Sequence, residues 1–153
     1  MGVSTEFLFR VAFDVPEVRE VGKGPLGIRR IARVSGGSFE GPRMRGVCLP
    51  NPGGDWLLFA DDGSARLDVR VVLKTDDDAI IYMTYGGVRH GPPEVLARIA
   101  AGQVVDPALY YFRTTPRFDV ESDSVHGWLG RTVFLCTAGR YSDHVRLDIF
   151  AIS

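Results

Sequence analysis

Two neighbouring segments with strict alternation, residues 65–75 and 79–85, constrain the fold of this chain more than any other feature. In the first segment apolar and charged side chains alternate, and a period of two places them on opposite faces of a β-strand. The apolar face carries Leu67, Val69, Val71 and Leu73. The charged face carries Arg66, Asp68, Arg70 and Lys74. Because an acidic turn at residues 76–78 joins the two segments, the pattern predicts a strand pair with one apolar face.

Short strand-like segments separated by glycine and proline continue along the rest of the chain. Strands are predicted at residues 7–13, 28–34, 45–49, 56–60, 65–75, 79–85, 110–114, 131–138 and 145–152. Asp62-Gly63 between two of them is typical of a hairpin turn, since glycine accepts positive φ. One segment, residues 94–102, has proline before it, apolar residues at helical spacing and glycine at its end, which predicts a short amphipathic helix.

Eight to ten short strands with one helix predict an all-β protein. We expect an antiparallel closed β-barrel in the style of lipocalins and streptavidin, formed as a single domain by residues 1–153. A two-sheet sandwich fits the same pattern, but about eight strands can close around just enough space for side chains or one small ligand. A parallel sheet is disfavoured, because no helix-length crossovers separate the strands.

Composition limits the classes of partner and the kinds of site that we expect. The 18 basic and 19 acidic residues are interspersed and give a net charge of −1, so no nucleic-acid partner is expected. No apolar run is long enough for a bilayer and no signal pattern opens the chain, which predicts no membrane association and a cytoplasmic location. Cys48 and Cys136 have no Cys or His neighbours at ligand spacing, and His90, His126 and His144 lie in separate loops, so neither a metal site nor a cofactor is predicted.

Two residues are candidates for acid–base catalysis. Gly53-Gly54 delivers Asp55 and Trp56 to the start of a strand, where an apolar neighbour raises the pKa of a carboxyl group and suits it to act as a general base. His126, close to Trp128, is the second candidate because histidine titrates near neutrality. The structural alternatives are an Asp55 that accepts hydrogen bonds within its own turn, a Trp56 that plugs the barrel end, and a His126 in an exposed loop.

Charged and aromatic strand faces supply the candidate ligand-binding residues. Asp68 and Arg70 share one face, where an arginine can bind a carboxylate or enolate and the aspartate can orient it. Tyr111 and Arg113 share a face of another strand, and Tyr82 lies on a third. The ligand-binding hypothesis places these faces inside the barrel and comprises Trp56, Asp68, Arg70, Tyr82, Tyr111, Arg113 and Trp128. The alternative is an outer charge ladder whose exposed pairs contribute about 0–1 kcal/mol each.

An ordered set of short motifs spans nearly the whole chain. It comprises Gly36-Gly37-Ser38-Phe39-Glu40-Gly41-Pro42, Gly53-Gly54-Asp55-Trp56, Asp62-Gly63, Leu67-Asp68-Val69-Arg70, Thr75-Asp76-Asp77, Tyr110-Tyr111-Phe112-Arg113-Thr114-Thr115-Pro116-Arg117-Phe118 and Trp128-Leu129. This set resembles the DUF3237 family, also called UPF0311. The resemblance implies a single-domain antiparallel β-barrel with no settled general activity. Asp78 and Gly130 depart from the family pattern, which usually has Gly and Asn there.

Two classes of function follow. The first is a barrel that binds a small planar or anionic organic ligand in its lumen, as a binding protein or as a cofactor-free lyase, isomerase or cyclase. The second is a non-catalytic structural or interaction protein whose barrel is filled with side chains. Under either hypothesis a homodimer is plausible, because the apolar segment 145–152 can pair with a second copy if it lies at a sheet edge.

Overall fold

A computed structural model describes all 153 residues, Met1–Ser153, and consists mainly of β-strands. The strands are β1 (Thr5–Asp14), β2 (Glu17–Gly24), β3 (Gly27–Arg33), β4 (Gly37–Glu40), β5 (Arg45–Cys48), β6 (Gly54–Phe59), β7 (Ala65–Thr75), β8 (Ile80–His90), β9 (Tyr111–Asp119), β10 (Phe134–Arg140) and β11 (His144–Ile152). The helix α1 covers Pro93–Ala100, and two 3₁₀ helices cover Pro107–Leu109 (η1) and Gly127–Arg131 (η2). The predicted short helix is therefore confirmed, with bounds one to two residues earlier than expected.

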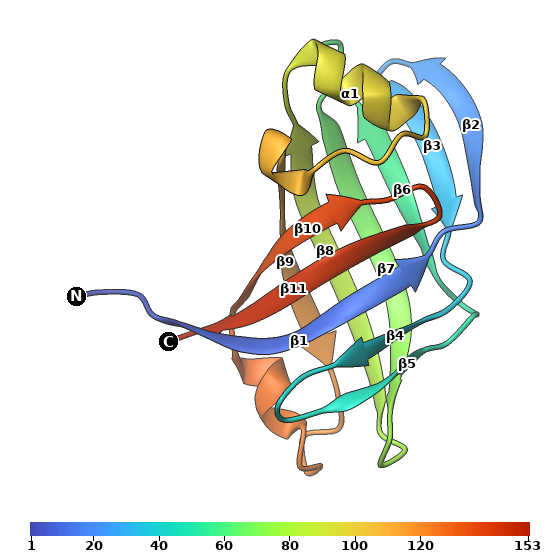
Figure 1. Cartoon of the computed structure of the whole chain (residues 1–153). Coiled ribbons are helices and arrows are strands. Elements are labelled where there is room, and N and C mark those ends of the chain that lie inside the picture. The colour runs from blue at the N-terminus through green and yellow to red at the C-terminus, as the bar shows by residue number, and fades with distance from the viewer.

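All strands belong to one antiparallel sheet that closes on itself (Figure 1). The closed ring runs β7-β5-β4-β1-β11-β10-β9-β8 and returns to β7, because β7 pairs with β5 on one side and with β8 on the other. The predicted antiparallel barrel is confirmed. Ring closure uses the hydrogen-bonding edges that an open sheet would expose.

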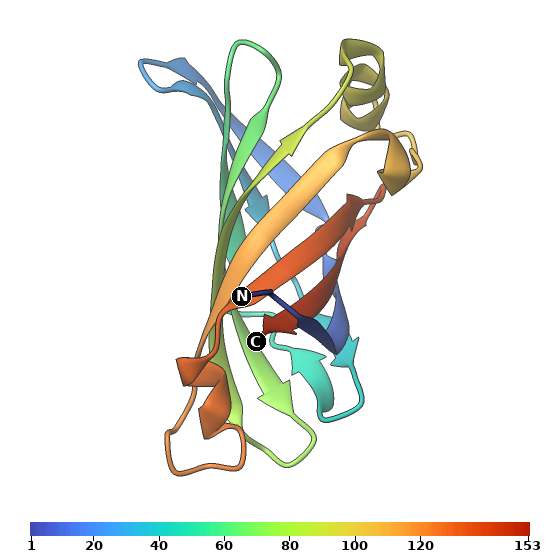
Figure 2. The same cartoon turned by 90° about the vertical axis from the view of Figure 1, so that its left-hand side faces the viewer.

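The long strand β7 has different neighbours on one side along its length. Its first part, Ala65–Arg70, pairs with β6, whereas only its last residues, from Leu73 to Thr75, pair with β5. β6 continues into β3 and β2, so these three strands branch from the ring. They extend toward the end of the barrel where α1 lies, beside the turn between β6 and β7 (Figures 1 and 2). We call this the α1 end, and the opposite end carries η2 and the turn between β7 and β8.

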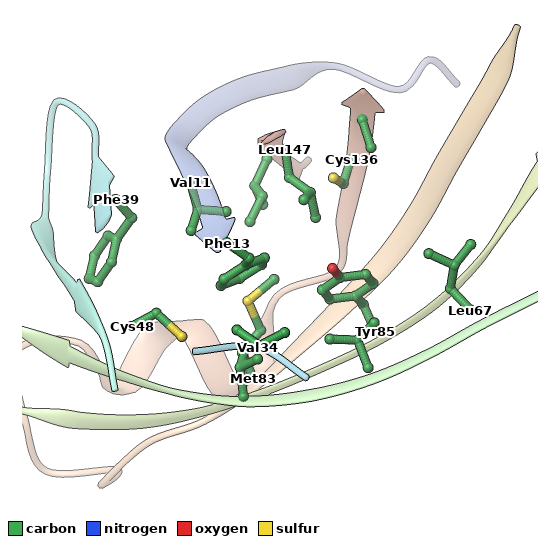
Figure 3. Packing of buried hydrophobic residues seen from close by; sticks show 14 of the residues in the cluster. Val11, Phe13, Val34, Phe39, Cys48, Leu67, Met83, Tyr85, Cys136 and Leu147 are labelled. Carbon is green, nitrogen blue, oxygen red and sulfur yellow. The ribbon is translucent and has the colours of Figure 1, made fainter. Parts of the chain in front are cut away.

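The alternating pattern of β7 places its apolar residues inside and its charged residues outside. Below the α1 end, side chains from many strands fill the interior and point toward one another (Figure 3). Those with less than 2% exposure include Phe9, Phe13, Leu73, Met83 and Leu147. This half of the barrel has the filled interior of an ordinary hydrophobic core.

The chain ends meet on the side of the barrel. The backbones of Ser4 and Ser153 exchange two hydrogen bonds of 3.0 Å, beyond the β1–β11 pairing. β11 pairs with β1 on one side and with β10 on the other, so it has no free edge and does not meet the condition for pairing with a second copy; a homodimer stays a prediction. The structure contains no helix that is both long and apolar enough to span a membrane.

Two strands continue past the glycines at which the sequence pattern ends them. β8 continues through Gly86-Gly87 to His90, and β10 continues through Gly139 to Arg140. We expected glycine to end these strands, but their pairing with β9 and β11 continues past the glycines. Gly87 is required there, since a Cβ at this position would lie 2.4 Å from the carbonyl oxygen of Arg113 on β9. Both extensions reach the α1 end, where they matter for the site.

Candidate functional site

A cavity of about 620 Å³ occupies the α1 end of the barrel. Its walls come mainly from β3, β6, β7, β8, β9 and β10, while β1, β2 and β11 contribute one residue each and α1 contributes Leu96 and Ile99. Hydrophobic residues make up 18 of the 25 that line it, so the few polar groups inside stand out. The volume lies within the range of small-molecule sites.

Asp55 is the buried acid of this cavity. It belongs to β6, where its neighbours are Ala32 on β3 and Val69 on β7, and it is only 8% exposed. Its Oδ1 accepts a hydrogen bond of 3.0 Å from the backbone N–H of Asp68, the only hydrogen bond of the carboxyl group. Burial raises the pKa of Asp55 to about 7, although that hydrogen bond and the charge of Arg89 act in the opposite direction. The carboxyl group therefore changes its protonation state near neutrality.

Three arginines line the same cavity, and two of them, Arg89 and Arg140, have no ion-pair partner. Arg89 ends the inner row of β8 and Arg140 ends the inner row of β10. Burial lowers the pKa of both guanidinium groups, and the charge of Arg140 lowers that of Arg89 further. Arg140 donates to the carbonyl oxygen of His144 at 3.2 Å, and Arg89 makes no side-chain hydrogen bond. Neither forms an ion pair with a carboxylate within 4.0 Å.

Tyr85 adds a neutral polar group beside Asp55. Asp55, Val69 and Tyr85 are cross-strand neighbours in one row over β6, β7 and β8. The Tyr85 side chain is 5% exposed, and its phenol oxygen points toward the interior (Figure 3). Burial raises the pKa of Tyr85 well above its ordinary value, with a further contribution from Asp55. The phenol therefore stays protonated and can donate a hydrogen bond within the cavity.

The strand faces chosen from the sequence lie outside the barrel, and the expectation that they line its lumen is wrong. Asp68 and Arg70 are each 59% exposed and lie 4.0 Å apart on the outer face of β7. Trp56, Tyr82, Tyr111 and Arg113 also project outward. Alternation predicts that a strand has two different faces but does not predict which face is the inner one. In the structure the apolar faces of β7, β8 and β9 point into the barrel. Of the predicted site residues, Asp55 lines the cavity.

His126 and Trp128 lie at the opposite end of the barrel and do not line the cavity. His126 is 8% exposed, and its Nε2 lies 3.0 Å from Oδ1 of Asp77 in the β7–β8 turn, so it is not the exposed loop histidine of the structural alternative. The guanidinium group of Arg43 lies 4.0 Å from the centre of a ring of Trp128. The structure thus places the two acid–base candidates at opposite ends of the protein.

Tyr85, Arg89 and Arg140 escaped the sequence analysis. The signal that points to them is the period of two along a strand. Ile81, Met83 and Tyr85 share the inner face of β8, and counting on by twos places Arg89 on the same face. On β10, the inner positions lead in the same way to Arg140. The predicted strands end before Gly86 and Gly139, so Arg89 and Arg140 fell outside them.

Comparison with known proteins supports the fold. Residues 3–152 match the family described as "Protein of unknown function (DUF3237)". The UPF0311 protein RPA1785 of Rhodopseudomonas palustris is 31% identical over 150 residues, which cover 98% of this chain and 97% of that protein. The crystal structure of RPA1785 from Rhodopseudomonas palustris, described as a conserved protein of unknown function, gives a TM-score of 0.96 and covers 100% of this chain and 99% of that one.

Two further crystal structures are similar over the full length. A β-barrel-like protein (ABAYE2633) from Acinetobacter baumannii AYE is 37% identical, with a TM-score of 0.86 and coverage of 100% of this chain and 98% of that one. An enzyme from Penicillium herquei is 18% identical, with a TM-score of 0.73 and coverage of 100% and 96%, a similarity that shows the fold alone. With a family match over almost every residue and relatives similar along their full length, this chain belongs to the DUF3237 family, whose curated members carry the name UPF0311.

Proposed function

We propose that the cavity at the α1 end binds a small organic molecule that is planar or anionic in part. We further propose that Asp55 moves a proton on it, in a cofactor-free lyase, isomerase or cyclase reaction. The observation that carries this proposal is the Asp55 carboxyl group, buried in a mostly apolar cavity and with a pKa of about 7. A general base or acid works best when its pKa lies near the working pH.

The surrounding groups suit proton abstraction next to a carbonyl group. The ionised carboxylate of Asp55 takes the proton from carbon, and the bonding electron pair moves to the carbonyl oxygen of the ligand as an enolate. The Tyr85 phenol or the guanidinium group of Arg89 or Arg140 donates hydrogen bonds to that oxygen. The protonated Asp55 then returns the proton to another atom of the ligand. Alternatively, the enolate re-forms its carbonyl group and makes a carbon–carbon double bond as the bond to a leaving group on the β carbon breaks, and the leaving group takes the proton from Asp55. These two outcomes correspond to an isomerase and a lyase.

The packed half of the barrel agrees with the alternative of a structural or interaction protein. The open half favours ligand binding instead. A barrel with only a structural role gains nothing from an enclosed carboxyl group that burial disfavours in its charged form, since burying such a group without an ion-pair partner costs stability. Strained or costly groups of this kind are concentrated at functional sites.

Substitutions of Asp55 and of its hydrogen-bond donor residue, Asp68, test the role of Asp55. The protein is screened by thermal shift against aromatic and alicyclic acids and ketones, and compounds that bind are followed by proton NMR in D₂O for exchange or turnover. Asp55→Asn should keep the fold and lose exchange and turnover by at least a hundredfold. Asp68→Asn is the matched control, because it changes an outer carboxylate and keeps the backbone N–H that donates to Asp55. Unchanged turnover in Asp55→Asn, or no binding anywhere in the panel, contradicts the proposal.

A further inference from the structure

We infer that the ligand of this cavity is an organic acid, and that Arg89 and Arg140 together bind its carboxylate while a flat apolar body fills the space between them and Asp55. This inference rests on the proposed function, because it takes the same cavity as the ligand site. It adds the chemical class of the ligand and the residues that select it.

The first argument is the missing partner of these two arginines. On the outer surface Arg10, Arg33 and Arg45 each lie 2.6–3.1 Å from a carboxylate oxygen. Arg89 and Arg140 are more enclosed but have no carboxylate oxygen within 4.0 Å, and Asp143 attracts the charge of Arg140 only from a greater distance. The third arginine of the cavity, Arg30, is already paired with Glu20 at 3.2 Å. The two unpaired guanidinium groups therefore leave an excess of positive charge beside an apolar space.

The second argument is the cost of that arrangement. An unpaired charge removed from water is unfavourable, and a second like charge nearby adds repulsion. Asp55 relieves this cost only in part, since it lies beyond 4.0 Å from both guanidinium groups and is in part protonated at neutral pH. A bound carboxylate would neutralise the excess charge and accept the planar array of N–H donors that arginine offers.

The third argument is the wall beside Arg89. Phe59, Ala65, Arg89 and Phe112 are cross-strand neighbours in one row toward the α1 end of the cavity. The Arg89 guanidinium carbon lies 6.0 Å from the ring centre of Phe59 and 5.7 Å from that of Phe112. Flat apolar surfaces therefore flank the place where the carboxylate binds, which favours a ligand with a flat apolar body.

The row of Asp55 lies deeper than the row of Arg89. The two rows cross β7 at Val69 and at Ala65, four residues apart, which is about 13 Å along a strand. The arginine side chain spans part of this separation. A ligand held by its carboxylate at the Arg89 row thus extends its body toward Asp55, where we propose that proton transfer occurs.

Binding of a charged and a neutral probe of the same shape tests the inference. Isothermal titration calorimetry at pH 7 compares 2-naphthoate with 2-naphthamide. The wild-type protein should bind 2-naphthoate at least tenfold more tightly. Arg89→Gln and Arg140→Gln should each lower the affinity for 2-naphthoate at least tenfold and leave that for 2-naphthamide within twofold. Arg70→Gln, which changes an arginine on the outer face, should leave both affinities unchanged.

Stability measurements separate loss of a contact from loss of the fold. Because each substitution removes an unpaired enclosed charge, the free Arg89→Gln and Arg140→Gln proteins should melt at the wild-type temperature or above it. Equal affinity for the two probes, or full affinity for 2-naphthoate in both variants, overturns the inference. If charge selection behaves as expected but Asp55→Asn retains turnover, the carboxylate site stands and the proposed proton transfer by Asp55 fails. If neither probe binds, the ligand cavity itself is contradicted.

Discussion

The carboxyl group of Asp55 and the guanidinium group of Arg89 line the same cavity, and the positive charge of Arg89 counteracts part of the effect of burial on the pKa of Asp55. Removing that charge should move the pKa of Asp55 further above 7. We expect this upward shift in Arg89→Gln, measured by carbon NMR titration of the aspartate carboxyl groups. Arg70→Gln is the control, and a pKa that is equal in the wild type and in Arg89→Gln would show that the two groups do not interact.

The raised pKa of Asp55 makes stability depend on pH. Its ordinary value is 3.8 and its value in the folded protein is about 7, so the folded state binds more protons between these limits. Stability contributed by this group therefore falls as pH rises from about 4 to about 7 and stays low above that. The shift corresponds to a penalty on the order of 4 kcal/mol at pH 8.

Asp55→Asn removes this titration while its side-chain oxygen can still accept from the N–H of Asp68. The free energy of unfolding of the variant minus that of the wild type should therefore increase between pH 4 and pH 7 and then level off. Urea unfolding at several pH values measures this difference, in which the other titrating groups cancel. A difference that does not change with pH would place the Asp55 carboxyl group in a solvated environment.

Much of the fold was predictable from residue patterns. The alternation of β7, the Asp62-Gly63 turn and the segment that forms α1 all behave in the structure as local propensity indicates. The direction of each strand face was not predictable in the same way, because a sheet with a period of two permits both assignments. The error at Arg70 came from preferring charge inside the barrel, whereas the burial of four apolar side chains on the opposite face outweighs any ion pair there.

The candidate site was predictable only in part for a related reason. Asp55 follows two glycines and attracts notice in the sequence, whereas Arg89 and Arg140 follow glycines that suggest the end of a strand. Whether a strand continues past a glycine depends on the neighbouring strand, which is a tertiary contact. Two of the three cavity groups that the sequence analysis missed, Arg89 and Arg140, therefore depend on contacts made by residues far away in the chain.

The outer pair of Asp68 and Arg70 provides a direct test of the corrected orientation. Both side chains are 59% exposed and lie 4.0 Å apart, and exposed pairs contribute about 0–1 kcal/mol. The double substitution Asp68→Asn, Arg70→Gln should change the free energy of unfolding by less than about 1 kcal/mol. Its affinity for 2-naphthoate should equal that of the wild type in calorimetry. A tenfold loss of affinity would return these residues to the ligand site.

Two leucines distinguish the filled half of the barrel from the open half. Leu73 is completely buried in the core, whereas Leu57 is 8% exposed and lines the cavity. Leu73→Ala should cost about 3–5 kcal/mol, because it removes contacts and leaves a void in a packed interior. Leu57→Ala should cost only about 1–2 kcal/mol, since its side chain already borders open space. Chemical denaturation compares the two, and equal losses would contradict a cavity at the α1 end.

Gly87 holds the continuation of β8 that brings Arg89 into the cavity. A Cβ at Gly87 would lie 2.4 Å from the carbonyl oxygen of Arg113, and backbone on a paired strand cannot move aside easily. Gly87→Ala should therefore destabilise the protein by about 1–3 kcal/mol and lower its affinity for 2-naphthoate, because β8 must shift away from β9. Gly86→Ala is the matched control: its Cβ would meet only the carbonyl oxygen of Leu67 at an ordinary 3.5 Å. If both variants unfold at the same denaturant concentration as the wild type, close approach at Gly87 does not determine the course of β8, and the position of Arg89 needs another explanation.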